Sequence, residues 1–131
     1  MESSESKAVV ERYFEVLSTG EGDLSALLTD DIVWWVPPGS DMAGEKRGRD
    51  DVLAFLGSGI DYYDETAPMD VTIRSMIAEG GQVACEFTIE ATTAKGKPYR
   101  NYYHFVFEVD GGRITQVREY LDTYYAHQAF H

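Results

Sequence analysis

The residues best suited to chemistry lie in the last third of the chain, in two runs that flank the turn Asp110-Gly111-Gly112. Two apolar runs around such a turn predict a β-hairpin. Because strand side chains alternate between two faces, Val117, Glu119 and Leu121 share one face of the second run. A carboxyl group among apolar neighbours loses hydration and gains a higher pKa, which suits proton exchange near neutral pH. Glu119 is therefore a candidate general acid or base, and the alternative is a surface carboxylate paired with a nearby arginine.

The first run of the hairpin also carries polar groups on its core-like face. Asn101, Tyr103 and Phe105 share this face by alternation. Polar groups buried among apolar ones need partners, so Asn101 and Tyr103 either line a binding pocket or close a buried hydrogen-bond network. We expect the pocket, with both side chains as hydrogen-bond donors and Phe105 in its apolar wall. His104 could act as a base, but alternation directs it to the opposite, outer face.

The rest of the chain contains the elements that would position this hairpin. Apolar residues recur at helical spacing in three segments, which predict helices over 6–18, 23–28 and 50–56. Alternating or β-branched runs predict strands over 32–36, 69–78, 82–93, 99–109 and 113–122. Loops are predicted over 37–48 and 60–67, and a frayed terminal helix over 124–130.

Helices that precede several hairpin-linked strands indicate the α+β class. We predict a cone-shaped α+β barrel, in which a strongly curved antiparallel sheet has the N-terminal helices packed on its concave face. Such a sheet leaves an apolar cavity under the helices, and cavities of this kind with a few polar groups are the usual ligand sites. Residues 1–131 are expected to form a single domain, since no linker, repeat or low-complexity segment interrupts them.

Residues outside the hairpin are further candidates for the cavity wall. Alternation places Trp34 and Val36 on one face of their strand, and Trp34 rather than Trp35 is the tryptophan expected to point inward. Phe55 would contribute from the third helix. Tyr13, on the apolar face of the first helix, could aim its hydroxyl at a ligand oxygen. Plain core packing is the alternative for each of them.

Composition narrows the classes of partner. The 131 residues carry a formal net charge of -12, which argues against binding to nucleic acid or to an anionic membrane. Cys85 is the only cysteine, so no internal disulfide is expected. Three scattered histidines give no metal-ligand spacing and the glycine pairs open no helix, so we expect no metal and no cofactor. No secretion leader or membrane-spanning apolar run is visible, which indicates the cytoplasm.

Several motifs occur in an order that points to one family. They are Val10-Glu11-Arg12-Tyr13-Phe14, Leu28-Thr29-Asp30-Asp31-Ile32-Val33-Trp34, Pro38-Gly39-Ser40, Arg47-Gly48-Arg49-Asp50, and Tyr103-His104-Phe105-Val106-Phe107 through Asp110-Gly111-Gly112-Arg113-Ile114 to Glu119-Tyr120-Leu121-Asp122. Through them nearly the whole chain resembles the SnoaL-like and ketosteroid-isomerase-like branch of the nuclear-transport-factor-two-like superfamily. The resemblance implies the cone-shaped fold and a small-molecule pocket. It implies no single reaction, because this fold hosts many activities.

The resemblance to ketosteroid isomerases can be followed at three positions. Their mechanism uses an Asp base together with a Tyr and a protonated Asp that stabilise the oxyanion. Tyr13 lies where that tyrosine would be, and Tyr103 lies where the protonated Asp would be and could still donate through its hydroxyl. Val36 lies where the base would be and cannot take a proton. Steroid-type isomerisation through that base is therefore not expected.

SnoaL-like cyclases and limonene-epoxide-hydrolase-like relatives place acid and base carboxylates on the late strands, which makes Glu119 and Asp122 the candidates here. Residues three apart in a strand point to opposite faces, so Asp122 reaches the cavity only if the strand ends there and the chain turns. The Asp-Arg-Asp arrangement of the epoxide hydrolases has no match on the inward face.

We therefore expect a protein that binds an apolar, oxygen-bearing small molecule and acts on it by proton transfer, without a cofactor, as an isomerase, cyclase, hydrolase or dehydratase. The catalytic candidates are Glu119, Tyr13 and Tyr103; the substrate-binding candidates are Asn101, Trp34, Val36, Phe55, Phe105, Val117 and Leu121; His104 and Asp122 are secondary candidates. The alternatives are a noncatalytic ligand carrier or dimerisation module, and protein binding on the sheet face. An aromatic outer face predicts a homodimer through Tyr102, His104, Val106 and Tyr120.

Overall fold

Six strands form one open sheet within residues 2–131, the part of the chain that the computed structural model describes. They are β1 (Leu28–Val36), β2 (Gly44–Arg47), β3 (Asp70–Glu79), β4 (Gln82–Thr92), β5 (Pro98–Asp110) and β6 (Arg113–Leu121). Their order across the sheet is β2-β1-β6-β5-β4-β3. Consecutive strands from β3 to β6 pair antiparallel, which confirms the predicted hairpins of the second half of the chain.

β1 joins the sheet in a way that departs from a wholly antiparallel pattern. It pairs antiparallel with β2 but parallel with β6. A parallel pair needs a long connection between its strands, and here all the strands from β2 to β5 lie between β1 and β6 in the chain. β6 is thereby enclosed between β1 and β5.

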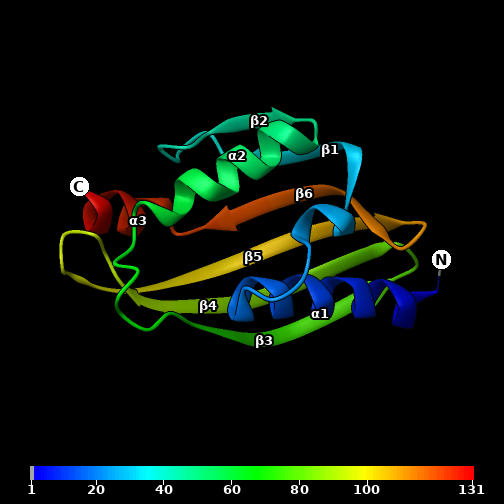
Figure 1. Cartoon of the computed structure of the whole chain (residues 1–131), viewed down its shortest axis with the longest axis horizontal. Helices are drawn as coiled ribbons and strands as arrows, with labels where there is room; N and C mark the ends of the chain where they lie inside the picture. The colour runs from blue at the N-terminus through cyan, green and yellow to red at the C-terminus, as the bar shows by residue number, and fades with distance from the viewer. Residues whose placement is uncertain (1) are drawn as a thin grey trace.

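Helices cover one face of the sheet. They are α1 (Ser3–Thr19), α2 (Arg49–Ile60) and α3 (Thr123–Phe130). Figure 1 shows α1 and α2 on the same side, with α1 against β3 and β4 and α2 along β1 and β2. α3 follows β6 and packs against β5. This is the predicted cone-shaped α+β arrangement, with the N-terminal helices on the concave face. No helix in this part of the chain is long and apolar enough to cross a membrane.

The first half of the sheet contains the main differences from the predicted elements. The segment 23–28 forms only a 3-10 turn, η1 (Leu24–Leu27), because Leu28 already pairs with Ile114 at the start of β1. β2 lies within the predicted loop 37–48. It is a short edge strand of mostly exposed residues, so it lacks the apolar alternation by which strands are recognised.

α2 begins and ends differently from the predicted helix over 50–56. Its N-cap is Gly48 rather than Asp50, and the φ of 89° at this position favours a residue without a side chain. Asp50 and Asp51 lie in the first turn instead, where their negative charges interact favourably with the helix dipole. The helix continues to Ile60 despite two glycines in its last turns.

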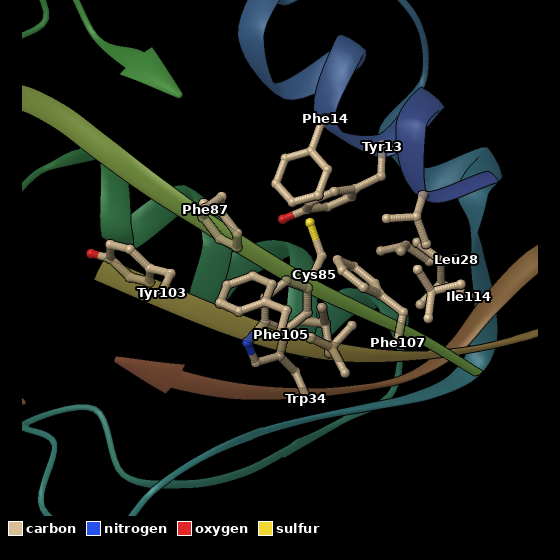
Figure 2. Packing of buried hydrophobic residues seen from close by; sticks show 14 of the residues in the cluster. Tyr13, Phe14, Leu28, Trp34, Cys85, Phe87, Tyr103, Phe105, Phe107 and Ile114 are labelled. Atoms are coloured by element: carbon tan, nitrogen blue, oxygen red, sulfur yellow. The ribbon is translucent and has the colours of Figure 1, made fainter. Parts of the chain in front are cut away.

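An aromatic cluster fills the space between α1 and the sheet (Figure 2). Phe14 packs edge-on against Phe87 with ring centroids 4.9 Å apart, and Tyr13 packs against Phe107 at 5.5 Å. Phe105 contacts Phe87 edge-on at 4.8 Å. Edge-to-face pairs of this kind stabilise a core beyond the area that they bury. The cluster therefore holds α1, and Tyr13 with it, in a defined position on the sheet.

The register between β5 and β6 determines which side chains of β6 face the helices. Phe105 pairs with Glu119, and Tyr103 pairs with Leu121. Directly paired residues share a face of the sheet. Because Tyr103 and Phe105 are buried on the concave face, Glu119 and Leu121 point to that face as well, as alternation predicted.

Candidate functional site

A cavity of about 190 Å³ lies between the helices and the concave face of the sheet. Its wall is mostly aromatic and aliphatic, and it is built from all three helices together with β1, β4, β5 and β6. A dry apolar cavity of about 150 Å³ holds a benzene ring, so this cavity has room for a substituted ring. Of the predicted site residues, those that line it are Tyr13, Trp34, Phe55, Tyr103, Phe105, Glu119 and Leu121.

Glu119 supplies the cavity with a carboxyl group. One of its oxygens, Oε1, accepts a hydrogen bond from the indole Nε1 of Trp34 at 2.9 Å. This is the only hydrogen bond to the carboxyl group from residues 2–131, which leaves Oε2 available to a ligand. Burial raises the pKa of Glu119 to about 7, an effect that the Trp34 hydrogen bond and the charge of Lys46 partly offset. At neutral pH this group can therefore both accept and donate a proton.

Lys46 is the cation whose charge lowers the pKa of Glu119, and sequence reasoning missed it. It pairs with Trp34 in the β1–β2 register, so both side chains lie on one face. Its Nζ donates to the carbonyl oxygens of Met42 and Gly44 and lies 4.6 Å from the ring centroid of Phe55. Burial lowers the pKa of Lys46, and the negative charge of Glu119 opposes that shift. No pattern in the sequence pointed to Lys46, because it lies in β2, a strand without apolar alternation.

Tyr13, on α1, lines the same cavity as Glu119. Its side chain is 2% exposed, and its ring lies 6.2 Å from the indole of Trp34. Burial and the negative charge of Glu119 raise the pKa of the Tyr13 phenol well above its usual range. The hydroxyl therefore stays protonated at any working pH, and it can donate a hydrogen bond to a ligand oxygen in the cavity.

A chain of tyrosine hydroxyl groups extends along the same wall. The hydroxyl oxygens of Tyr99 and Tyr103 are 2.6 Å apart, and Asn101 Nδ2 donates to the Tyr99 hydroxyl at 2.9 Å. Tyr63, which lines the cavity with Tyr103, packs edge-on against Tyr99 with centroids 5.7 Å apart. Burial raises the pKa of Tyr103 well above its usual value, so its hydroxyl remains a neutral hydrogen-bonding group.

Asn101 does not line the cavity. Its Nδ2 also donates to the carbonyl oxygen of Asp122 at 3.1 Å, and its Oδ1 accepts from the backbone N–H of Tyr102 at 2.8 Å. With 1% of its side chain exposed, Asn101 closes a buried hydrogen-bond network, which was the alternative to its predicted role in the pocket. Asp122 is exposed and caps α3, where its Oδ1 accepts from the backbone N–H of Tyr125 at 3.0 Å.

The remaining predicted site residues lie away from the cavity. Val36 and Val117 are almost completely buried in the core of the sheet and are absent from the cavity wall. His104 is exposed on the convex face, where it pairs with Tyr120 of β6. Trp35 also points to that face and packs against the Tyr120 ring at 5.3 Å, so Trp34 is the inward tryptophan, as alternation predicted.

Asp41, His127 and His131 form a polar cluster at the rim of the cavity, and sequence reasoning did not connect them. Asp41 lies in the loop between β1 and β2, and the two histidines lie at the end of α3. His127 Nδ1 is 2.8 Å from Asp41 Oδ2, and His131 Nε2 is 3.1 Å from the same oxygen. The four-residue spacing of the two histidines on a helix was the available signal.

Comparison with known proteins identifies the family. The family model of the SnoaL-like domain matches residues 10–117. The chain is 32% identical over 114 residues to the uncharacterized protein Rv0034 of Mycobacterium tuberculosis, an alignment that covers 86% of this chain and 85% of that protein. The chain therefore belongs to the SnoaL-like family, a small-molecule-binding family within the nuclear-transport-factor-two-like superfamily.

Solved structures share the fold at low sequence identity. Bal32a, from a soil-derived mobile gene cassette, is 21% identical with a TM-score of 0.86, and the match covers 100% of both chains. TerC, in a crystal grown with polyporic acid, is 18% identical with a TM-score of 0.84, and the match covers 96% of this chain and 98% of that chain. At these identities the likeness shows the shared fold.

Proposed function

We propose that this protein is an enzyme that moves a proton on an apolar, oxygen-bearing small molecule, as an isomerase, cyclase, hydrolase or dehydratase. The observation that carries the proposal is the carboxyl group of Glu119, which lines an apolar cavity and has a pKa of about 7. General acid–base catalysis is most efficient when the pKa of the catalytic group lies near the working pH.

The arrangement suits chemistry next to a carbonyl group. Ionised Glu119 removes a proton from the carbon beside the carbonyl, and the electron pair of that C–H bond moves onto the carbonyl oxygen. The neutral hydroxyl of Tyr13 donates a hydrogen bond to the developing oxyanion. Protonated Glu119 then returns its proton to another carbon while the carbonyl re-forms, which isomerises the substrate. Alternatively, the enolate carbon attacks a second carbonyl and closes a ring, the first carbonyl re-forms, and the new alkoxide oxygen takes the proton from Glu119.

Neighbouring side chains orient Glu119 and contact the substrate. Trp34 holds one oxygen of Glu119 through its indole N–H, so the other oxygen can point to the substrate. Tyr103 offers a second neutral hydroxyl on the same wall, while Phe55 and Phe105 provide apolar contact. The co-crystallisation of TerC with polyporic acid supports this use of the fold, since it places a small organic molecule with a protein of the same architecture.

A noncatalytic ligand carrier is the second candidate function. The observation that favours it is Val36, which occupies the position of the base in the ketosteroid-isomerase pattern and is buried in the core. In both cases we propose a cytoplasmic homodimer that contacts its partner through the convex face of the sheet.

Ligand binding and turnover can be separated experimentally. A thermal-shift screen of substituted cyclic ketones and enones at pH 7 identifies binders, because a ligand stabilises the folded state. Each binder is then incubated with the protein in D2O, and exchange of its acidic C–H protons is followed by NMR. We expect Glu119→Gln to bind the same compounds and to lose at least about 100-fold in exchange rate.

The matched control is Glu79→Gln, which changes an exposed carboxylate at the end of β3 in the same way. This variant should exchange protons at the wild-type rate. Binding without exchange in the wild-type protein supports the carrier, and equal exchange in wild type and Glu119→Gln contradicts the role of Glu119.

A further inference from the structure

Three potential metal ligands converge where the loop after β1 meets the end of α3. One ligand atom from each of Asp41, His127 and His131 lies within 4.8 Å of the other two. Both histidines turn a ring nitrogen toward the same carboxylate oxygen, Asp41 Oδ2. A single histidine paired with a carboxylate is an ordinary surface contact, but two imidazoles aimed at one oxygen form a donor set.

The fold holds the ligands from both sides. His127 lies in the last turn of α3 and His131 directly follows the helix, four residues further on, and the two rings lie 4.9 Å apart. Asp122 caps the start of this helix, and Lys95 Nζ donates to the carbonyl oxygen of His131 at 2.8 Å. On the opposite side, the loop that carries Asp41 is closed by hydrogen bonds around Ser40.

The donor set and its dimensions suit a transition metal. Imidazole nitrogen with carboxylate oxygen is a combination that Zn²⁺, Co²⁺ and Ni²⁺ accept, whereas Mg²⁺ and Ca²⁺ prefer oxygen alone. Ligand atoms at about 2.0–2.2 Å from a tetrahedral Zn²⁺ are about 3.2–3.6 Å apart. The separations of 2.8 Å and 3.1 Å between each histidine nitrogen and Asp41 Oδ2 need to widen slightly to admit the ion, and the three ligand atoms all lie within 4.8 Å of one another.

We propose that Asp41, His127 and His131 bind one divalent transition-metal ion at the mouth of the cavity. Three protein ligands leave a coordination position open for water or for an oxygen of a ligand. Asp41 and His127 both line the cavity, so the open position borders the space that a substrate occupies. The site revises the sequence expectation of no metal, which treated the histidines as scattered. It is independent of the proposed proton transfer, which uses Glu119 and Tyr13.

The test is a Co²⁺ titration of the full chain without an affinity tag, followed by visible absorption and by isothermal titration calorimetry. A large excess of Mg²⁺ occupies the many surface carboxylates of this acidic protein and suppresses nonspecific binding. Four proteins are compared: wild type, Asp41→Asn, His127→Gln and His104→Gln. The last removes the one histidine outside the cluster and is the matched control.

We expect wild type and His104→Gln to bind one Co²⁺ with the same affinity, and the two cluster variants to bind at least about tenfold more weakly. Asp41→Asn replaces an exposed side chain with one of the same size, so this variant should fold, which circular dichroism checks. It therefore tests the site even if His127→Gln is unstable. Absence of one-to-one binding in the wild type, or equal affinity in all four proteins, overturns the proposal. Neither result depends on whether Glu119 transfers protons.

Discussion

Glu119 experiences opposing influences on its ionisation. Burial against the aromatic wall raises the pKa of its carboxyl group, while the indole N–H of Trp34 and the charge of Lys46 lower it. An ion pair with arginine, the alternative that the sequence left open, would lower that pKa instead. Within residues 2–131 the carboxyl group forms no such pair, and its one hydrogen bond comes from a neutral donor. The raised pKa therefore follows from a buried acid that lacks a fully compensating cation.

This environment predicts a dependence of stability on pH that disappears in Glu119→Gln. In the unfolded chain Glu119 ionises near pH 4.5, whereas in the folded protein it keeps its proton up to about pH 7. Between these values the unfolded state binds fewer protons, so the contribution of Glu119 to the free energy of unfolding falls as pH rises. We expect wild type to lose about 2 kcal/mol relative to Glu119→Gln between pH 5 and pH 8, a value reduced for solvent contact in the cavity.

Urea denaturation of both proteins at several pH values measures this difference. Glu79→Gln serves again as the control, since its exposed carboxylate should give parallel curves for variant and wild type. A difference between wild type and Glu119→Gln that stays constant from pH 5 to pH 8 would show that Glu119 is not buried in the way described.

The elements that sequence predicted well are those with local signals. β3 to β6 alternate in polarity and are joined by glycine turns, so their hairpins could be predicted. β2 has no such pattern, so neither this strand nor the effect of its Lys46 on the pKa of Glu119 could be predicted. The contact between Trp34 and Glu119 depends on the pairing of β1 with β6, two strands far apart in the chain, and no local pattern contains that pairing.

Asn101 shows a different limit of sequence reasoning. Its alternation with buried residues fits a pocket and a closed network equally well. Only the positions of Tyr99 and the Asp122 carbonyl, which its amide contacts, distinguish the two.

Two glycines at element level should respond to alanine in opposite directions. A Cβ at Gly81, in the turn between β3 and β4, would lie 2.6 Å from the backbone oxygen of Val109 on β5. Gly81→Ala should therefore destabilise the protein by about 1–3 kcal/mol, because the turn and β5 must move apart to make room for the methyl group. Gly57, inside α2, has open space around it, and Gly57→Ala should stabilise by about 0.5–1 kcal/mol.

Urea unfolding of both alanine variants at one pH provides the comparison, with equal m-values as evidence that the unfolded states are alike. If Gly81→Ala proved neutral, the close approach of the turn to β5 would be wrong.

At the scale of the whole molecule, charge and apolar surface act against each other. The chain carries a formal net charge of -12, which keeps copies apart at low salt. Its convex face nevertheless exposes aromatic side chains, including Tyr102 at 53% and Tyr120 at 44%. Exposed apolar patches on soluble proteins commonly mark interaction sites. Association through this face should therefore become stronger when salt screens the charges.

We predict a homodimer whose affinity rises with salt and falls in the double variant Tyr102→Glu/Tyr120→Glu. Charges placed in an apolar contact should weaken association by at least about tenfold. Sedimentation velocity over a range of protein and salt concentrations measures the effect. Tyr124→Glu is the control, since Tyr124 is 72% exposed and lies on α3 rather than on a strand of the sheet. A wild-type protein that remains monomeric throughout would contradict this prediction.

The position of β6 between β1 and β5 has a consequence for the order in which the molecule is made. In the chain β1 and β2 precede β3, β4 and β5, and β6 follows them all, so β1 cannot join the rest of the sheet until β6 has been synthesised. Until β6 is made, the β1–β2 pair and the strands β3 to β5 each keep an open edge and an uncovered aromatic surface, a state prone to aggregation. β6 also carries Glu119, so an intermediate without β6 lacks the carboxyl group of the candidate site.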